Sequence, residues 1–130
     1  MAFSDWAEHR VLEYFLRTNT NFTPQQVYAA LFLSATTDAG GGTEVPAANS
    51  YARTAITFGA AQTPGGTSNN SVDITFPQAA GDWGTITHLG IFDRSTTGNL
   101  IFHGALANTK LVQSGDTFKI PAGNLVVTVS

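Results

Sequence analysis

The chain after Pro24 consists of short apolar stretches that are separated by turn-forming residues. Its 130 residues include 13 glycines and 5 prolines. Glycine adopts the backbone conformations of tight turns, and proline cannot donate the hydrogen bond that a helix interior or a central strand requires. Seven or so short strands with turn signals at regular spacing are typical of antiparallel all-β domains. The sequence therefore predicts a mainly β fold, either an antiparallel β-sandwich or a jelly-roll-like barrel, with one N-terminal α-helix.

The N-terminal segment has the apolar periodicity of that helix. Apolar residues that recur there at helical spacing are Phe3, Trp6, Ala7, Val11, Tyr14 and Phe15. Residues at this spacing lie on one face of a helix. Ser4 or Asp5 can cap the first turn, and Pro24 prevents continuation. We expect a helix over residues 4–18, followed by a β domain over residues 26–130.

The apolar stripe of this helix is wider than one contact surface requires, because Leu12 and Leu16 extend it. We therefore expect Trp6, Tyr14 and Phe15 to face the sheet, while the two leucines contact a neighbouring subunit. The helix would then belong to the core and also serve as an attachment element. Together with the low share of charged residues, 12%, this apolar surface favours self-association.

Composition and length exclude several classes of protein. With 130 residues the chain is long enough for one hydrophobic core, and we expect a single domain over residues 1–130. Six Lys and Arg side chains and a net charge of −3 cannot neutralise a run of phosphates, so no nucleic acid is an expected partner. The absence of cysteine excludes disulfides and thiolate metal sites. No apolar run approaches the roughly 20 residues that cross a bilayer, so no membrane location is expected. The N-terminus carries no secretory signal pattern.

The segment from residue 85 to residue 107 predicts a β-hairpin. Pairing Asp93 with Leu100 places His88 and His103 on the same face of this hairpin. The apolar residues expected on that face are Ile86, Phe92 and Ile101. The residues expected on the opposite face, which is the better core, are Leu89, Ile91, Leu100, Phe102 and Leu106. Because no carboxylate of the hairpin shares the face of the histidines, a metal would lack its third ligand. We interpret that face as a semi-buried or interface surface.

Two long loops, Thr36 to Asn49 and Ala60 to Asn70, are candidate contact surfaces. Their central residues are Gly40, Gly41 and Gly42 in the first loop and Pro64, Gly65 and Gly66 in the second. Neither glycine run is followed by the Lys-Ser or Lys-Thr of a phosphate-binding loop. Long loops with little apolar surface are usually functional or disordered, and we expect these two to gain order on a partner.

No motif in the sequence indicates an enzyme. The chain lacks the Gly-x-Ser-x-Gly elbow and the His-Glu-x-x-His zinc motif, and its aspartates are not spaced as in a calcium loop. The tripeptide Asp82-Trp83-Gly84 permits a less favoured interpretation, in which the indole stacks on a sugar and the carboxylate accepts hydroxyl hydrogen bonds. An aromatic residue before a strand is more often a core anchor. We therefore expect no catalytic residue, no metal and no cofactor.

Several phrases of the sequence occur in the order found in one known family. They are Asp38-Ala-Gly-Gly-Gly-Thr-Glu-Val45, Tyr51-Ala-Arg53, Asp82-Trp-Gly-Thr-Ile-Thr-His-Leu-Gly-Ile-Phe-Asp93, Gly98-Asn-Leu-Ile-Phe-His-Gly-Ala-Leu106 and Ser114-Gly-Asp-Thr-Phe118. Over nearly its whole length the chain resembles a family of small virion proteins of tailed bacteriophages that are commonly labelled tail fibre proteins. The resemblance implies a virion component that is made in the bacterial host cytoplasm, and it transfers no catalytic residue.

The sequence leaves more than one structural function open. A fibre shaft would show repeats or heptads, and the sequence has none. We therefore favour a capsid decoration (cement) protein that binds between capsid subunits as an oligomer, with a homotrimer as the favoured state. The alternative is a tail-fibre or baseplate module that acts in host attachment, and a third candidate is a carbohydrate-binding domain. The expected partners are the major capsid protein or tail components.

Overall fold

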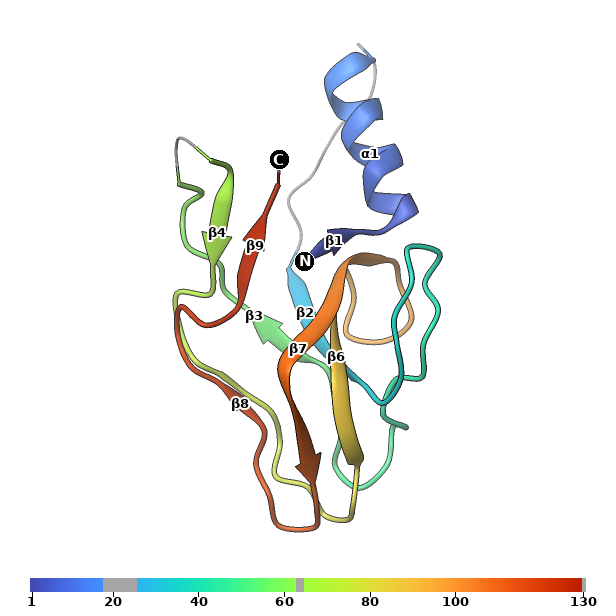
Figure 1. The fold of residues 1–130 in the computed structure, drawn as a ribbon, viewed down its shortest axis with the longest axis vertical. Coiled ribbons are helices and arrows are strands. Elements are labelled where there is room, and N and C mark those ends of the chain that lie inside the picture. The colour runs from blue at the N-terminus through green and yellow to red at the C-terminus, as the bar shows by residue number, and fades with distance from the viewer. Residues whose placement is uncertain (18–25, 63–64, 130) are drawn as a thin grey trace.

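A computed structural model of the chain describes residues 1–17, 26–62 and 65–129. The elements along the chain are β1 (Ala2–Phe3), α1 (Asp5–Leu16), β2 (Val27–Phe32), β3 (Thr54–Ile56), β4 (Thr67–Asn69), β5 (Ile74–Thr75), β6 (Gly84–Phe92), β7 (Leu100–Val112), β8 (Lys119–Ile120) and β9 (Val126–Thr128). One five-stranded antiparallel sheet has the order β1-β7-β6-β2-β3 (Figure 1). The other strands form two short sheets, β4 with β9 and β5 with β8.

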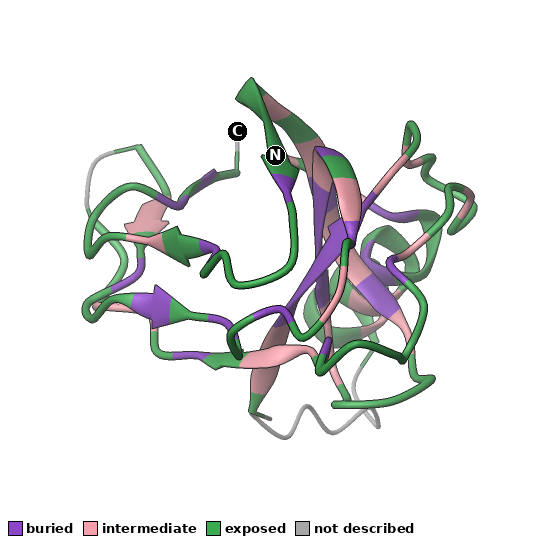
Figure 2. Ribbon diagram, turned by 90° about the horizontal axis from the view of Figure 1, so that it is seen from below, coloured by how far each residue is buried: buried purple, intermediate pink, exposed green. Residues whose placement is uncertain are grey.

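One hydrophobic core joins the five-stranded sheet to the two short sheets. The large sheet contributes Ala29, Leu31, Ile86, Leu89 and Ile91, and the short sheets with their connections contribute Ile74, Phe76, Phe118, Leu125 and Val127. Figure 2 shows the large sheet on one side of the molecule and the short sheets on the other, with buried residues in both. Tyr51 packs against Phe76 and Trp83, with ring centroids 6.4 and 5.3 Å away. The two layers are therefore held together by aromatic and aliphatic contacts.

The predicted fold class is confirmed. Antiparallel strands dominate the described part of the chain, and its helix is N-terminal. The sheets do not close on themselves, so the arrangement is that of a sandwich and not of a barrel. The apolar run that begins at Val27 forms β2, which lies between β6 and β3. Its last four residues are buried, as the sequence pattern indicates for a strand that is covered on both faces.

Helix α1 begins at a serine cap, and its first turn fixes it to two other segments. The Ser4 hydroxyl oxygen accepts a hydrogen bond from the Ala7 N–H at 3.1 Å, and the same hydroxyl donates to the Leu100 carbonyl oxygen. The N–H of Asp5 donates to the Asp38 carbonyl oxygen at 2.9 Å. The start of α1 is therefore held both by β7 and by the loop that follows β2.

The rest of α1 extends away from the sheet and does not lie across it (Figure 1). The prediction that Trp6, Tyr14 and Phe15 face the sheet is wrong, because these residues are 38%, 47% and 74% exposed. The reason is the position of β1, which pairs with β7 at the edge of the sheet and so starts the helix beyond that edge. The helix ends at Leu16, and residue 18, its predicted end, lies outside the described residues.

The β6–β7 hairpin has the predicted register at its centre. His88 lies opposite Ala105, and His103 lies opposite Gly90. The pairing then shifts between Ile86 and His88, where β7 contains extra residues. An irregularity of this kind turns the following side chains to the other face of the sheet. Ile86 consequently lies in the core and is fully buried, so the prediction that it shares a face with the histidines is wrong.

The register shifts a second time near the hairpin tip. Phe92 lies opposite Leu100, whereas the simplest register pairs Leu100 with Asp93. Leu100 therefore leaves the core face on which it was expected. A Cβ atom at Gly90 would lie 2.9 Å from a Phe32 ring carbon and 3.0 Å from the Leu100 Cδ1 atom. A larger residue at this position would have to displace these neighbouring side chains, so the packing favours glycine.

Candidate functional site

The second face of the five-stranded sheet, opposite the core, is where segments far apart in the sequence meet. We define the second face by Phe32, Gly90, Phe92, Leu100 and His103. The rings of Phe32 and Phe92 stack there, with centroids 6.1 Å apart. The loop between β2 and β3, which we call the covering loop, lies against this face, and the hairpin tip and the first turn of α1 adjoin it.

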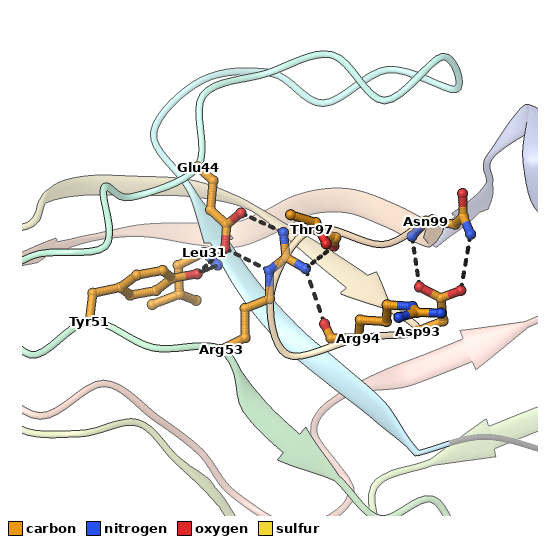
Figure 3. A network of polar contacts seen from close by, with 8 residues as sticks. All are labelled: Leu31, Glu44, Tyr51, Arg53, Asp93, Arg94, Thr97 and Asn99. Carbon is orange, nitrogen blue, oxygen red and sulfur yellow. Dashed lines mark hydrogen bonds and ion pairs between the residues drawn. The ribbon is translucent and has the colours of Figure 1, made fainter.

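A partly buried ion pair joins Glu44 in the covering loop to Arg53 at the end of the same loop, just before β3 (Figure 3). The Arg53 Nε and Nη2 atoms donate to the two carboxylate oxygens of Glu44 at 2.9 and 2.8 Å. The Tyr51 hydroxyl donates to Glu44 Oε2 at 2.6 Å and accepts from the Leu31 N–H at 3.0 Å. Burial, and then the hydrogen bond to Glu44, raise the pKa of Tyr51 well above its ordinary value. Tyr51 therefore stays protonated and acts as a permanent donor.

The same arginine holds the hairpin tip in one conformation. Its Nη1 atom donates to the carbonyl oxygens of Arg94 and Thr97 at 3.1 and 2.6 Å. Its Cζ atom lies 3.7 Å from the centroid of the Phe92 ring, a cation–π contact. Thr97 has a φ angle of 52°, which is costly for a β-branched residue. The contacts of Arg53 therefore offset local backbone strain and order the tip (Figure 3).

The neck of the hairpin tip is closed by one carboxylate. Asp93 accepts hydrogen bonds from the backbone N–H of Asn99 at 2.7 Å and from its side-chain Nδ2 at 3.1 Å. A shallow cavity of about 310 Å³ adjoins the tip and is lined by Gln26, Tyr28, Asp93, Arg94, Ser95, Thr96 and Thr97. The tip is thus fixed at its neck by Asp93 and along its length by Arg53.

His103 fixes the covering loop to the second face. Its Nε2 atom lies 2.7 Å from Asp38 Oδ1, and its Nδ1 atom lies 2.8 Å from Thr36 Oγ1. The residue is 8% exposed, so it is buried within this chain by the loop. The sequence analysis found no carboxylate for this face, because Asp38 comes from a loop and not from the hairpin. Nothing in the spacing of residues 36–103 could have indicated this contact.

The remaining hairpin residues that were proposed as an interface lie in different environments. His88 is half-buried, and its Nδ1 atom lies 2.8 Å from the hydroxyl of its neighbour Thr87. Phe92 and Ile101 are also half-buried. Within the described residues, no group of three His, Cys, Asp or Glu side chains could hold a metal ion. The two histidines therefore do not converge on one site.

A larger cavity, which we call the α1 hollow, lies beside the first turn of the helix. Its volume is about 490 Å³, and its lining residues are Ser4, Asp5, Trp6, Asp38, Ala39, Gly40, Phe92, Gly98, Asn99 and Leu100. The walls thus come from α1, the covering loop and the hairpin tip. Sequence reasoning missed this site, because each wall reads in the sequence as an ordinary turn or helix cap. The walls come together only in the folded chain.

The glycine runs of the two long loops occupy defined positions in the fold. In the covering loop the N–H groups of Gly40 and Gly41 donate to the carbonyl and the hydroxyl of Thr37 at 3.0 and 2.8 Å. Gly40 and Gly42 have φ angles of 89° and 101°, so these turns need glycine. In the second loop Gly65 and Gly66 also have positive φ angles, and Gly66 accepts from the N–H of Val129. Pro64 lies outside the described residues.

The tripeptide weighed as a sugar-binding element is part of the core instead. Trp83 is 4% exposed, and its indole N–H donates to the Asn49 carbonyl oxygen at 2.9 Å. Its ring packs in the hydrophobic core and forms a T-shaped contact with Tyr51. Asp82 accepts a hydrogen bond from the Ser114 N–H at 2.9 Å. The indole and the carboxylate therefore have structural roles and present no platform for a sugar.

Comparison with known proteins gives the family of the chain. No helix within the described residues is long and apolar enough to span a membrane. No curated protein matches the sequence. A family model described as Podophage GP4 fiber I protein gp80 matches residues 2–128, which include α1 and every strand of the fold. The chain therefore belongs to the family of the podophage GP4 fiber I protein gp80, a family of phage virion structural proteins of the fibre type.

Proposed function

We propose that this chain is a non-enzymatic structural module of a phage fibre that joins other virion components through α1. The observation that carries this proposal is the exposed apolar surface of the helix. Leu12, Phe15 and Leu16 are 58%, 74% and 75% exposed, and Ala7 is the buried residue of α1. Exposed apolar clusters of this kind mark protein–protein contacts. The family match to a fibre protein supports the same function.

Burial of this surface would stabilise an assembly considerably. Each large apolar side chain that moves from water into a contact contributes about 1.5–3 kcal/mol. Hydrogen bonds at the first turn hold the helix to β7 and to the covering loop, so its exposed outer turns can meet a neighbour without unfolding the β domain. We infer that the neighbour is a second copy of this chain or another fibre component, and we favour a homotrimer.

A capsid decoration protein is the second candidate. The absence of repeats and heptads favours it, since an extended fibre shaft would need them. In that function α1 and the covering loop would contact capsid subunits. The number of copies per virion separates the two candidates. A few to a few dozen copies are expected for a fibre module, and hundreds for a decoration protein.

The attachment function of α1 is tested with the double variant Leu12→Ser/Leu16→Ser. We expect sedimentation analysis to show loss of self-association or of virion incorporation, while the far-UV circular dichroism of the β domain stays unchanged. The matched control is Val72→Ser/Leu111→Ser, since both residues are 53% exposed but lie on other elements. If the α1 variant unfolds, or if both variants assemble like the parent chain, the proposed attachment surface is wrong.

A further inference from the structure

We propose that the α1 hollow is a binding site for a neutral carbohydrate. Its volume of about 490 Å³ lies within the range of sites that hold small molecules. This inference goes beyond the structural function, because attachment uses the outer turns of α1 and the hollow lies at its first turn. The two assignments can therefore fail separately.

The first argument is an aromatic ring at the wall of the hollow. Trp6 lines the cavity and is 38% exposed, whereas the other tryptophan, Trp83, is buried in the core. An exposed indole offers a flat apolar face together with a polar N–H donor. The C–H face of a pyranose ring packs on such a surface, while its hydroxyl groups remain free for hydrogen bonds. Phe92 adds a second apolar wall.

The second argument is the set of acceptor atoms in the lining. Asp38 uses Oδ1 for His103, and its Oδ2 has no partner among the described residues. Asn99 uses its N–H groups for Asp93, which leaves its side-chain oxygen as an acceptor. The carboxylate of Asp5 makes no hydrogen bond within the described chain. A ligand with several donors suits this lining, and sugar hydroxyls are such donors.

The lining also discriminates between classes of ligand. Lysine and arginine are absent from the residues that line the hollow, whereas two carboxylates are present, so a phosphate or sulfate would be repelled. The Arg10 guanidinium lies 5.9 Å from the centroid of the Trp6 ring, so this indole already has a cation–π contact within the chain. A cationic ligand on the same ring would be repelled by Arg10. A neutral polyol carries no charge that the two carboxylates or Arg10 would repel.

The groups that would touch the sugar are held in place before it binds. The backbone before Trp6 is fixed, since the Ser4 N–H donates to the Ile101 carbonyl at 2.8 Å and the Asp5 N–H donates to the covering loop. His103 holds the Asp38 carboxylate at 2.7 Å. Preformed sites of this kind bind with a smaller loss of conformational entropy.

The test is a titration of the complete chain with neutral monosaccharides and disaccharides, followed by the indole N–H signals in ¹H–¹⁵N spectra. We expect a saturable shift of the Trp6 indole signal at millimolar sugar, together with shifts of the Gly40 and Asn99 amides. The Trp83 indole signal serves as an internal control and should not move, because that ring is buried. No saturable shift at Trp6 with any neutral sugar would overturn the proposal.

Two variants that each replace a single carboxylate by an amide, one inside the α1 hollow and one outside it, make the test specific for this site. Asp38→Asn should weaken sugar binding at least about tenfold, because a charged acceptor is lost. Glu8→Gln is the matched control on the exposed side of α1, outside the hollow, and should bind like the parent chain. Equal affinity in both variants would contradict the assigned site. Shifts with tetramethylammonium but not with sugars would show a cation site instead, and would also overturn the proposal.

The assembly variant keeps this test separate from the proposed function. Leu12→Ser/Leu16→Ser changes residues that do not line the hollow, so it should bind sugar with unchanged affinity. Sugar binding without self-association would leave the carbohydrate site standing and contradict attachment through α1. Self-association without sugar binding would do the reverse.

Discussion

The two faces of the five-stranded sheet are stabilised by different interactions. The core face is packed with aliphatic and aromatic side chains, such as the fully buried Leu31 and Ile91. On the second face the rings of Phe32 and Phe92 stack, and polar side-chain contacts hold the covering loop there, among them the Arg53–Glu44 and His103–Asp38 pairs. The difference teaches how a loop rich in Gly, Thr and Ser can be ordered. Val45 and Tyr51 anchor it in the core, and its Asp38 and Glu44 side chains fix it further by hydrogen bonds that are partly shielded from water.

This difference between the two faces also suggests a division of roles, in which the core face stabilises the fold and the second face carries the proposed binding site. The core face joins the two layers through buried side chains. The second face brings the hairpin tip, the covering loop and α1 together around the α1 hollow. Loops positioned by a rigid sheet are the usual carriers of binding function. The following variants test this division, from the largest expected effect to the smallest.

Removal of a core ring should have the largest effect on stability. Phe76 is 1% exposed and packs against Tyr51 and Phe118. We expect Phe76→Ala to lower the free energy of unfolding by about 3–5 kcal/mol, because it leaves a cavity in the core. Urea denaturation followed by circular dichroism measures this loss. The control Val72→Ala, at a residue that is 53% exposed, should change stability by less than about 0.5 kcal/mol.

Loss of the Glu44 carboxylate in the covering loop should have an intermediate effect. Glu44→Ala leaves the Arg53 guanidinium, whose side chain is 9% exposed, without its partner. We expect a loss of about 2–3 kcal/mol, reduced from that of a fully buried pair because the Glu44 side chain is 25% exposed. Glu44→Gln keeps an acceptor and should lose less. If Glu44→Ala lowered the free energy of unfolding as much as Phe76→Ala does, the proposed distinction between the two faces would be wrong.

Removal of the His103 side chain should loosen the covering loop without unfolding the domain. In His103→Ala the Asp38 carboxylate and the Thr36 hydroxyl lose their contacts with the ring. We expect hydrogen exchange at Gly41 and Thr43 to become about tenfold faster, which corresponds to about 1.4 kcal/mol. The amides of β4 should be unaffected. His88→Ala is the matched histidine control, and equal acceleration in that variant would contradict this role.

An exposed ion pair outside both faces should contribute least. The N–H of Ala122, and then the Lys119 ammonium group, hold the pKa of Asp73 below its usual value near 4. Because its pKa is lower in the folded chain, Asp73 contributes stability above about pH 4 and loses that contribution as the pH falls through the folded pKa. We expect Asp73→Asn to be slightly less stable than the parent chain at pH 7, with a difference that disappears in acid. A difference that grows in acid would contradict this sign.

Local sequence patterns were sufficient for much of the architecture. The run from Val27 became β2, and Ser4 became the cap of α1. The central pairing of Gly90 with His103 followed from the simplest hairpin register. These features depend on neighbours in sequence, on alternation and on turn chemistry. The side chains of α1 were misassigned, because periodicity identifies an apolar face but does not say what covers it.

The sequence by itself determined the fold class, the family resemblance and the absence of catalytic motifs, since composition, spacing and contiguous phrases carry that information. Only the tertiary structure decided which side chains meet. Two irregularities in one hairpin moved Ile86 into the core and Leu100 out of it. The contacts of Asp38 with His103 and of Glu44 with Arg53 depend on the path of the covering loop, which sequence periodicity does not predict. The α1 hollow exists for the same reason, because its walls come from segments that are joined only by long-range hydrogen bonds and burial.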